Sequence, residues 1–420
     1  MPDTADEEST DKEKTLMPLP VVAMMLCTFC IGTAESVIAG ILPAIATDVG
    51  VSLSAVGMLI SVYAVAVVLL GPFVTAATVR LRQSVLMPCM MGVFVLGNVL
   101  AALSPGFGWL IAGRVVSALV HSTLIAAFVA AARDMAPADR RAAWGAKVTL
   151  GIGLSSVAGV PAGTLIGNAF GWRATFWALA ALSLAAGALL MRCTVPDPLP
   201  TAAASGGTTD TVQRKRALPG PMLLVALVIV LGTGGVFALY TYASPYLTQS
   251  AGFGPQTVTV LLLLYGAGGI LGNTVGGRAA DHSPRAAVLV TLGTATATLM
   301  LLSLPVGGQG IVAGLFCLLG AAYFATIPAL NTQIVTAAGT ASPTMALTIN
   351  NSAFCVGIAL GSWLGGFLLA HGHALPSVAA AGAALTGAAL LLALVSVKHG
   401  RGTARTPEPA IPKTTSPTPR

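Results

Sequence analysis

Three ionisable side chains lie inside long apolar segments, where a charge is costly and is rarely kept without a use. Glu35 is the only acidic residue within a predicted membrane span, and Arg114 and His121 lie seven residues apart in another. A carboxyl group in hydrocarbon loses hydration, which disfavours its charged form and lets it gain and lose a proton near neutral pH. This pattern predicts a proton-coupling site formed by Glu35, Arg114 and His121.

Each of the three also has a structural explanation. Arg114 could form a fixed ion pair or extend its head group to the membrane surface, and His121 could make an ordinary hydrogen bond between helices. A purely structural role is the weaker interpretation for Glu35, because Ser or Asn would serve such a role at lower cost.

The elements that hold these residues must be membrane helices. The chain of 420 residues is 55% hydrophobic and only 8% charged, against about 25% charged in soluble domains. A span needs about 20 apolar residues. Breaks at Pro, Gly and charged residues predict twelve spans, near residues 19–42, 53–77, 84–104, 108–132, 142–167, 173–193, 220–245, 256–280, 286–304, 310–330, 344–370 and 375–397.

The charge pattern predicts the orientation of these spans. If both termini are cytoplasmic, all of the 21 Lys and Arg residues except Arg114 and Arg173 fall on the cytoplasmic side, as the positive-inside rule requires. We therefore expect a multi-pass protein of the cell (inner) membrane. The net charge of +7 is explained in this way, and no basic, aromatic face suggests nucleic acid.

The spans form two similar halves. We expect an all-α membrane protein with a cytoplasmic tail (1–18), a six-helix bundle (19–193), a cytoplasmic linker (194–219), a second six-helix bundle (220–397) and a disordered tail (398–420). Glycines recur every four residues at 159–167, 268–276 and 357–365, so each set shares one helix face. We expect them to pack helices closely and to provide a sliding interface between the halves, with the binding site near the midplane.

Other polar residues in the spans are candidates for a substrate cavity, although each is more often a helix–helix hydrogen bond. The candidate cavity set is Tyr63, Tyr240, Tyr242, Tyr265, Asn273, Asn350 and Asn351. Cys27 and Cys30 form a C-x-x-C inside an apolar run, where packing is a better interpretation than redox chemistry or zinc. We expect no cofactor and no metal.

Several motifs together resemble the major facilitator superfamily, in particular its twelve-span drug:proton antiporter branch. The first span reads Gly-Thr-Ala-Glu at residues 32–35 and Gly-Ile-Leu-Pro at 40–43, and the fourth carries Arg114 followed by His121. The fifth, from Gly159 through Pro161 and Gly163 to Gly167, resembles the branch's antiporter motif. Gly277-Arg-Ala-Ala-Asp281, followed by Arg285, resembles the superfamily's cytoplasmic loop motif.

The resemblance implies a monomeric secondary transporter in the bilayer that exchanges protons for a small molecule, with Gly159, Pro161, Gly163, Asp281 and Arg285 in gating. The chain also departs from the branch. The first loop motif lacks the usual aspartate, Ser36 replaces a Phe, and Cys355 stands where an Asn is usual in the eleventh span.

We expect proton-coupled efflux of an antibiotic or metabolite by alternating access. Uptake or facilitated transport of a sugar or nucleobase is the alternative. An enzyme is the rival outside transport, but no H-E-x-x-H, G-x-S-x-G or phosphate-binding G-x-x-x-x-G-K motif is present, and a receptor would lack the repeat of six spans.

Overall fold

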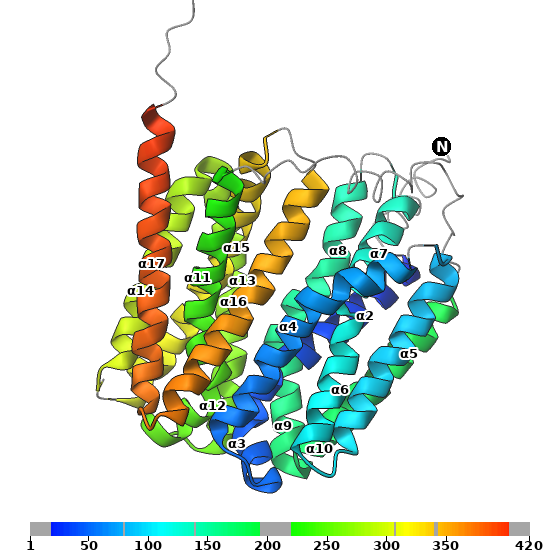
Figure 1. The fold of residues 1–420 in the computed structure, drawn as a ribbon, viewed down its shortest axis with the longest axis horizontal. Coiled ribbons are helices and arrows are strands. Elements are labelled where there is room, and N and C mark those ends of the chain that lie inside the picture. Colours follow the sequence, from blue (N-terminus) through cyan, green and yellow to red (C-terminus); the bar gives the residue numbers. More distant parts are fainter. Residues whose placement is uncertain are drawn as a thin grey trace, which may run out of the picture.

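The computed structural model describes residues 18–78, 80–137, 140–193, 220–305, 308–339 and 343–402, and the regular structure in these ranges is helical (Figure 1). Twelve helices in the described part are long and apolar enough to cross a membrane. The predicted class, an all-α membrane protein with twelve spans, is therefore confirmed. The predicted N-terminal tail and linker lie outside the described residues, apart from Pro18 in the tail.

The first bundle contains α2 (Leu19–Ser36), α3 (Ile38–Val49), α4 (Leu53–Thr78), α5 (Gln83–Ala102), α6 (Phe107–Leu119), α7 (His121–Met135), α8 (Arg141–Leu154), the π-helical turn η1 (Ser155–Gly159), α9 (Val160–Phe170) and α10 (Trp172–Met191). The second contains α11 (Gly220–Thr241), α12 (Ala243–Pro245), η3 (Tyr246–Ser250), α13 (Pro255–His282), α14 (Pro284–Ser303), α15 (Gln309–Ala337), α16 (Pro343–Ala370) and α17 (Leu375–Gly402). Most spans match their predicted ranges within a few residues. Residues 398–402, predicted as part of a disordered tail, continue α17 as helix.

Four spans are interrupted, which the apolar runs alone did not predict. The first breaks at Val37 and continues as α3 to Val49, well beyond the predicted end at 42. The fourth breaks at Val120, the fifth contains η1, and the seventh breaks at Tyr242. Interrupted spans expose main-chain groups that need new partners, and in transporters they often border binding sites.

The glycine faces pack inside the bundles. Added Cβ atoms on Gly159, Gly163 and Gly167 would meet the first span at Thr33, Val37 and Ile41, respectively. The corresponding face of α16, at residues 357–365, lies against α11, and the face of α13, at residues 268–276, lies against α15. The expectation of a sliding interface between the halves is therefore wrong for these faces, which lock each bundle internally.

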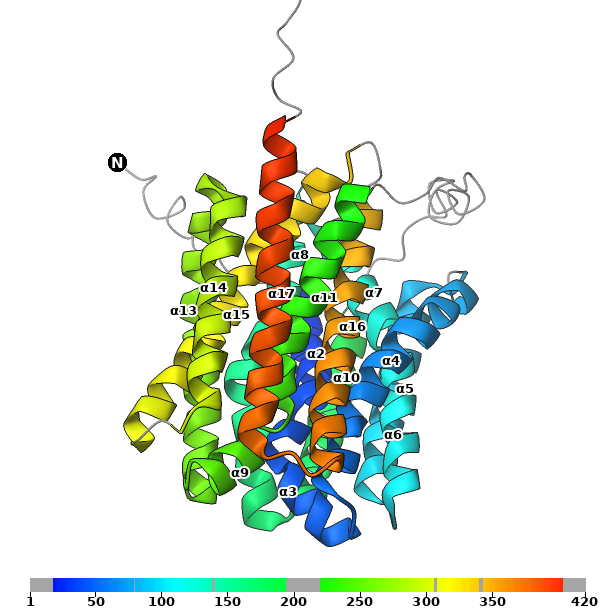
Figure 2. The same cartoon turned by 60° about the vertical axis from the view of Figure 1, so that its left-hand side comes forward.

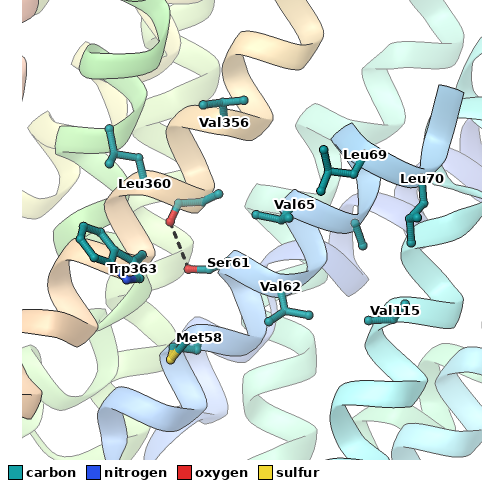
Figure 3. Close-up of a pocket in the computed structure, with 12 residues that line it drawn as sticks. Met58, Ser61, Val62, Val65, Leu69, Leu70, Val115, Val356, Leu360 and Trp363 are labelled. Carbon is teal, nitrogen blue, oxygen red and sulfur yellow. Dashed lines mark hydrogen bonds between the residues drawn. The ribbon is translucent and has the colours of Figure 1, made fainter.

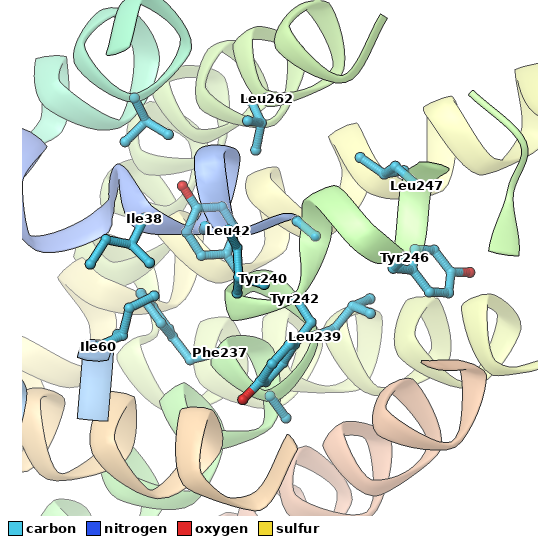
Figure 4. Packing of buried hydrophobic residues seen from close by; sticks show 14 of the residues in the cluster. Ile38, Leu42, Ile60, Phe237, Leu239, Tyr240, Tyr242, Tyr246, Leu247 and Leu262 are labelled. Carbon is cyan, nitrogen blue, oxygen red and sulfur yellow. The ribbon is translucent and has the colours of Figure 1, made fainter. Parts of the chain in front are cut away.

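The bundles touch at one end of the molecule. We call this the distal end, because α2 begins and α17 ends at the other, terminal end (Figures 1 and 2). The main contacts between the bundles pair α3, α4, α9 and η1 with α11, α12, α13 and α16. One large apolar cluster crosses between the bundles there, joining Ile38 and Ile60 to Phe237 and Leu262 (Figure 4). Around Met24 and around Leu292, by contrast, each bundle has an apolar cluster of its own.

Candidate functional site

Glu35 lies at the end of α2, two residues before the interruption at Val37. It is partly accessible, whereas Ala34 and Val37 on either side of this turn are fully buried. Among the described residues, its carboxylate has no hydrogen bond and no ion pair. The acid is thus deep in the membrane-spanning region but held by no fixed partner.

Arg114 on α6 binds the main chain beside this acid. Its Nη1 donates to the carbonyl oxygen of Ala34 at 2.5 Å and its Nη2 to that of Glu35 at 3.3 Å, while the Nε has no partner among the described residues. The break at Val37 removes the main-chain donors that a continuous helix would offer these two carbonyls. Arg114 is therefore near Glu35, as predicted, but it satisfies the broken helix and does not pair with the carboxylate.

Tyr63 on α4 connects Arg114 to His121. The guanidinium carbon lies 4.2 Å from the centroid of the tyrosine ring, a cation–π distance. The tyrosine hydroxyl is 2.9 Å from Nδ1 of His121, the first residue of α7 after the break at Val120. The structure thus brings Glu35, Arg114 and His121 into one polar cluster, and it places Tyr63 in that cluster with its side chain fully buried.

Two residues of the second bundle feel the charge of Glu35, and the sequence did not single out either for this role. Tyr323 on α15 and Cys355 on α16 lie close enough to Glu35 for its charge to act on both. In the sequence, Cys355 stands out only as a departure from the Asn that is usual in the family, and Tyr323 belongs to no motif. Their proximity to Glu35 comes from the apposition of the two bundles.

Two of the candidate cavity residues belong to an aromatic cluster beside Tyr323. Tyr240 and Tyr265 have ring centroids 4.7 Å apart, and Phe237 lies 5.3 Å from Tyr240 and 5.8 Å from Tyr323. Figure 4 shows Tyr240 projecting from α11 toward the α3 segment that carries Ile38 and Leu42. No hydrogen bond from the hydroxyl of Tyr240 or Tyr265 to another described residue is present.

The other candidate cavity residues lie elsewhere. Tyr242 is fully buried between α4 and α16, where its hydroxyl donates to the carbonyl oxygen of Ser362 at 3.1 Å. The side-chain amide of Asn350 donates to Asn331 at 2.8 Å within the second bundle. Asn273 and Asn351 are exposed. The structure therefore does not gather the predicted cavity set into one place.

The predicted gating residues fall into two groups. Gly159 and Gly163 pack on the first span, and Pro161 is buried between them at the start of α9. Asp281 and Arg285 are exposed where α13 meets α14, and no ion pair joins them. Their part in gating stays a prediction.

One surface groove in the described part is apolar and lies apart from Glu35. It has a volume of about 620 Å³ and crosses the outer face of α4 between α16 and α6 (Figure 3). Its walls include the exposed Met58, Val65, Leu69 and Trp363, and its only polar lining residue is Ser61. A face of this kind suits lipid chains. Among the described residues, no group of His, Cys, Asp and Glu side chains is arranged to hold a metal.

Comparison with known proteins places this architecture in a family. The sequence model described as Major Facilitator Superfamily matches residues 24–362. The chain belongs to this superfamily, is a transporter and not an enzyme, and is a multi-pass membrane protein.

Particular relatives cover almost the whole chain. It is 35% identical over 362 residues to a chloramphenicol resistance protein of Streptomyces lividans, covering 84% of this chain and 90% of that one. It is 34% identical to the inner membrane transport protein YdhP of Escherichia coli K12 (90% and 96% covered) and 28% identical to the putative transporter AraJ of the same strain (91% and 95%).

Solved structures share the fold at low identity. A D-xylose–proton symporter superposes with a TM-score of 0.69 at 18% identity, covering 89% of this chain and 96% of the symporter. A bacterial homologue of the human lysosomal transporter Spinster, in an inward-facing conformation, gives 0.67 at 15% identity, covering 94% and 100%.

Proposed function

We propose that this transporter is a proton-driven exporter, exchanging protons for a small organic compound by alternating access across the cell membrane with both termini cytoplasmic. The observation that carries the proposal is the carboxylate of Glu35, which lies within the spans without a hydrogen bond or ion pair to any described residue. A lone acid in this position is a functional site by default.

The contacts of the polar cluster suit a change of charge on Glu35. An acid with no fixed partner can be protonated without breaking a bond. Arg114 is held by main-chain carbonyls, so its position does not depend on the state of the carboxylate. Because the charge of Glu35 acts on Tyr323 and Cys355 of the second bundle, protonation changes the electrostatics between the bundles. These relations would couple a proton to the relative position of the two halves.

Export is favoured over uptake by the relative named for chloramphenicol resistance. Chloramphenicol is therefore the first probe, within a panel of antibiotics and metabolites. The likeness to the xylose–proton symporter concerns the fold alone, so it does not favour sugar uptake.

The test uses the whole chain in proteoliposomes with an imposed pH gradient. The wild type should move the probe against its gradient and toward the more acidic side, and an uncoupler should abolish this movement. Glu35→Gln should fold and insert, but lose more than about tenfold of the gradient-driven rate while keeping exchange of probe for probe. Asp48→Asn, at the exposed end of α3, is the matched control and should leave transport unchanged.

Two results would count against the proposal. Unchanged gradient-driven export by Glu35→Gln at every pH would remove Glu35 from coupling. Movement of the probe together with protons would indicate symport.

A further inference from the structure

The side chain of Tyr242 occupies a space lined by three glycines where the two bundles meet. Its ring lies against Gly365 of α16, and its hydroxyl lies against Gly366 and against Gly57 of α4, a helix of the other bundle. A Cβ on any of the three would overlap the tyrosine. Tyr242 is fully buried and occupies the break between α11 and α12, so its backbone is not part of a continuous helix.

Two serines of α4 flank this contact and bind the second bundle directly. Ser54 Oγ donates to the carbonyl oxygen of Gly366 at 2.7 Å. Ser61 Oγ donates to that of Ala359 at 3.1 Å, the bond dashed in Figure 3. The donors are seven residues apart, as are the acceptors, so α4 and α16 run antiparallel in register. A third hydrogen bond between described residues of the two bundles, from Asn168 to the carbonyl of Pro255 at 3.4 Å, lies at the same distal end.

These bonds are suited to being broken repeatedly. Ala359 and Gly366 lie within α16, so their carbonyls also serve as helix acceptors, and the serines add a second bond to each. When the bundles part, the carbonyls keep their helical partners and the serine hydroxyls can turn to their own helix. The contact therefore leaves no orphaned buried group on opening, unlike a broken buried ion pair.

We propose that Tyr242, seated on Gly57 and flanked by Ser54 and Ser61, is the latch that keeps this transporter closed at its distal end. It is a positioning device and does not touch the transported molecule. Closure lets the terminal ends of the bundles separate, and opening of the latch accompanies access from the distal side. This inference adds to the proposed function, but it requires only alternating access and not proton coupling or export.

Spin labels at Ser52→Cys and His373→Cys, in a variant without native cysteines, report the distance across the latch. Gly57→Leu should displace Tyr242 and raise the population with the longer distance by more than tenfold. Adding Tyr242→Ala to Gly57→Leu should restore the short distance, because the leucine then occupies the space that the ring leaves. Ser54→Ala and Ser61→Ala should each shift the equilibrium by up to about tenfold.

Tyr246→Phe is the matched control. Tyr246 is four residues away, and its hydroxyl donates to the carbonyl of Leu302 inside the second bundle at 2.6 Å. This variant should lose a buried hydrogen bond without changing the distance. In transport assays, Gly57→Leu should change KM and kcat in opposite directions, whereas loss of folded protein lowers only the apparent rate.

The latch is overturned if Gly57→Leu is folded, by its elution and thermal unfolding, and yet keeps the wild-type distance. It is also overturned if Tyr246→Phe opens the distal end as much as Gly57→Leu. If the distances shift as expected but the wild type moves no probe against a pH gradient, the proposed function fails and the latch stands.

Discussion

Arg114 acts on the main chain of the first span through two donors of one guanidinium group. Its contacts explain why an arginine stands at a fully buried position near an acid without forming an ion pair. The planar fork can reach two carbonyls at once, which a single ammonium group cannot do in the same geometry. The tyrosine ring below it adds a cation–π contact.

Arg114→Lys should therefore destabilise the protein although it keeps the charge. Leaving one carbonyl of the broken span without a donor costs about 1–3 kcal/mol, and transport should fall more than about tenfold as Glu35 loses its position. Thermal unfolding in detergent and the proteoliposome assay measure both effects, with the exposed Arg133→Lys as control. Full stability and activity of Arg114→Lys would show that a simple positive charge suffices.

Tyr63→Phe tests the link between Arg114 and His121. The ring remains under the guanidinium, but the partner of the His121 Nδ1 is lost, at a cost of about 1–3 kcal/mol in unfolding free energy. In a double-mutant cycle with His121→Leu, the two losses should be non-additive, because both remove the same bond. Additive losses would contradict the bond.

At the scale of elements, close glycine contacts hold each bundle together internally. The faces of η1, α9 and α16 pack on the first helix of their own half, at Thr33 to Ile41 and at Thr233 to Tyr242, which repeats one arrangement in both halves. Backbone atoms form several of these contacts, so the neighbouring helix must shift when a methyl group is added. Each bundle is accordingly expected to move as a unit.

Gly361→Ala is the sharpest test of this packing. Its Cβ would overlap the carbonyl oxygen of Gly234 on α11, and overpacking of this kind costs about 1–3 kcal/mol. Gly153→Ala, in α8 with open space around it, is the control and should gain about 0.5–1 kcal/mol from helix propensity. Equal unfolding temperatures for the two variants would contradict the packing.

The distal end of the first bundle is also fastened by Asp48 at the end of α3. Its carboxylate accepts hydrogen bonds from Arg173 and, at 3.0 Å, from Trp172 Nε1, while Arg173 donates to the carbonyl of Ser104 at 3.1 Å. The hydrogen bonds from Arg173 and Trp172 lower the pKa of Asp48 below its ordinary value.

The pKa of Asp48 is lower in the folded protein than in the unfolded chain. Its carboxylate therefore stabilises the fold at pH values above the ordinary pKa of a carboxyl group, and this stabilisation is lost as the pH falls through the pKa of the folded state. Asp48→Asn should therefore reduce stability at pH 7, by at most about 1 kcal/mol since both side chains are nearly half exposed, and should reduce it less at pH 3. Unfolding temperatures across this pH range provide the measurement. A difference that grows on acidification would have the wrong sign.

At the scale of the whole molecule, the bundles share one large apolar cluster at the distal end and a smaller one in which Cys355 packs with Tyr63, and each bundle keeps a cluster of its own elsewhere. This distribution describes a transporter closed at the distal end. If the basic residues of the terminal end are cytoplasmic, as we propose from their distribution, the closed end faces outward.

A pair of histidines tests that orientation. His282 is the exposed last residue of α13 at the terminal end, and His373 is exposed between α16 and α17 at the distal end. In intact cells and a background without native cysteines, a membrane-impermeant maleimide should label His373→Cys and spare His282→Cys. The opposite labelling would reverse the topology.

The sequence by itself determined the fold class, the number of spans and the three ionisable residues, because apolar length and the cost of charge in hydrocarbon act locally along the chain. It did not reveal that Arg114 binds carbonyls, that Tyr63 lies between Arg114 and His121, or that the charge of Glu35 acts on Tyr323 and Cys355 of the other bundle. The sequence also led us to expect Tyr242 in a substrate cavity and the glycine faces between the halves, whereas the structure buries Tyr242 between α4 and α16 and packs the glycine faces inside the bundles. These relations depend on where four spans break and on how two bundles meet, which only packing between residues distant in the chain decides.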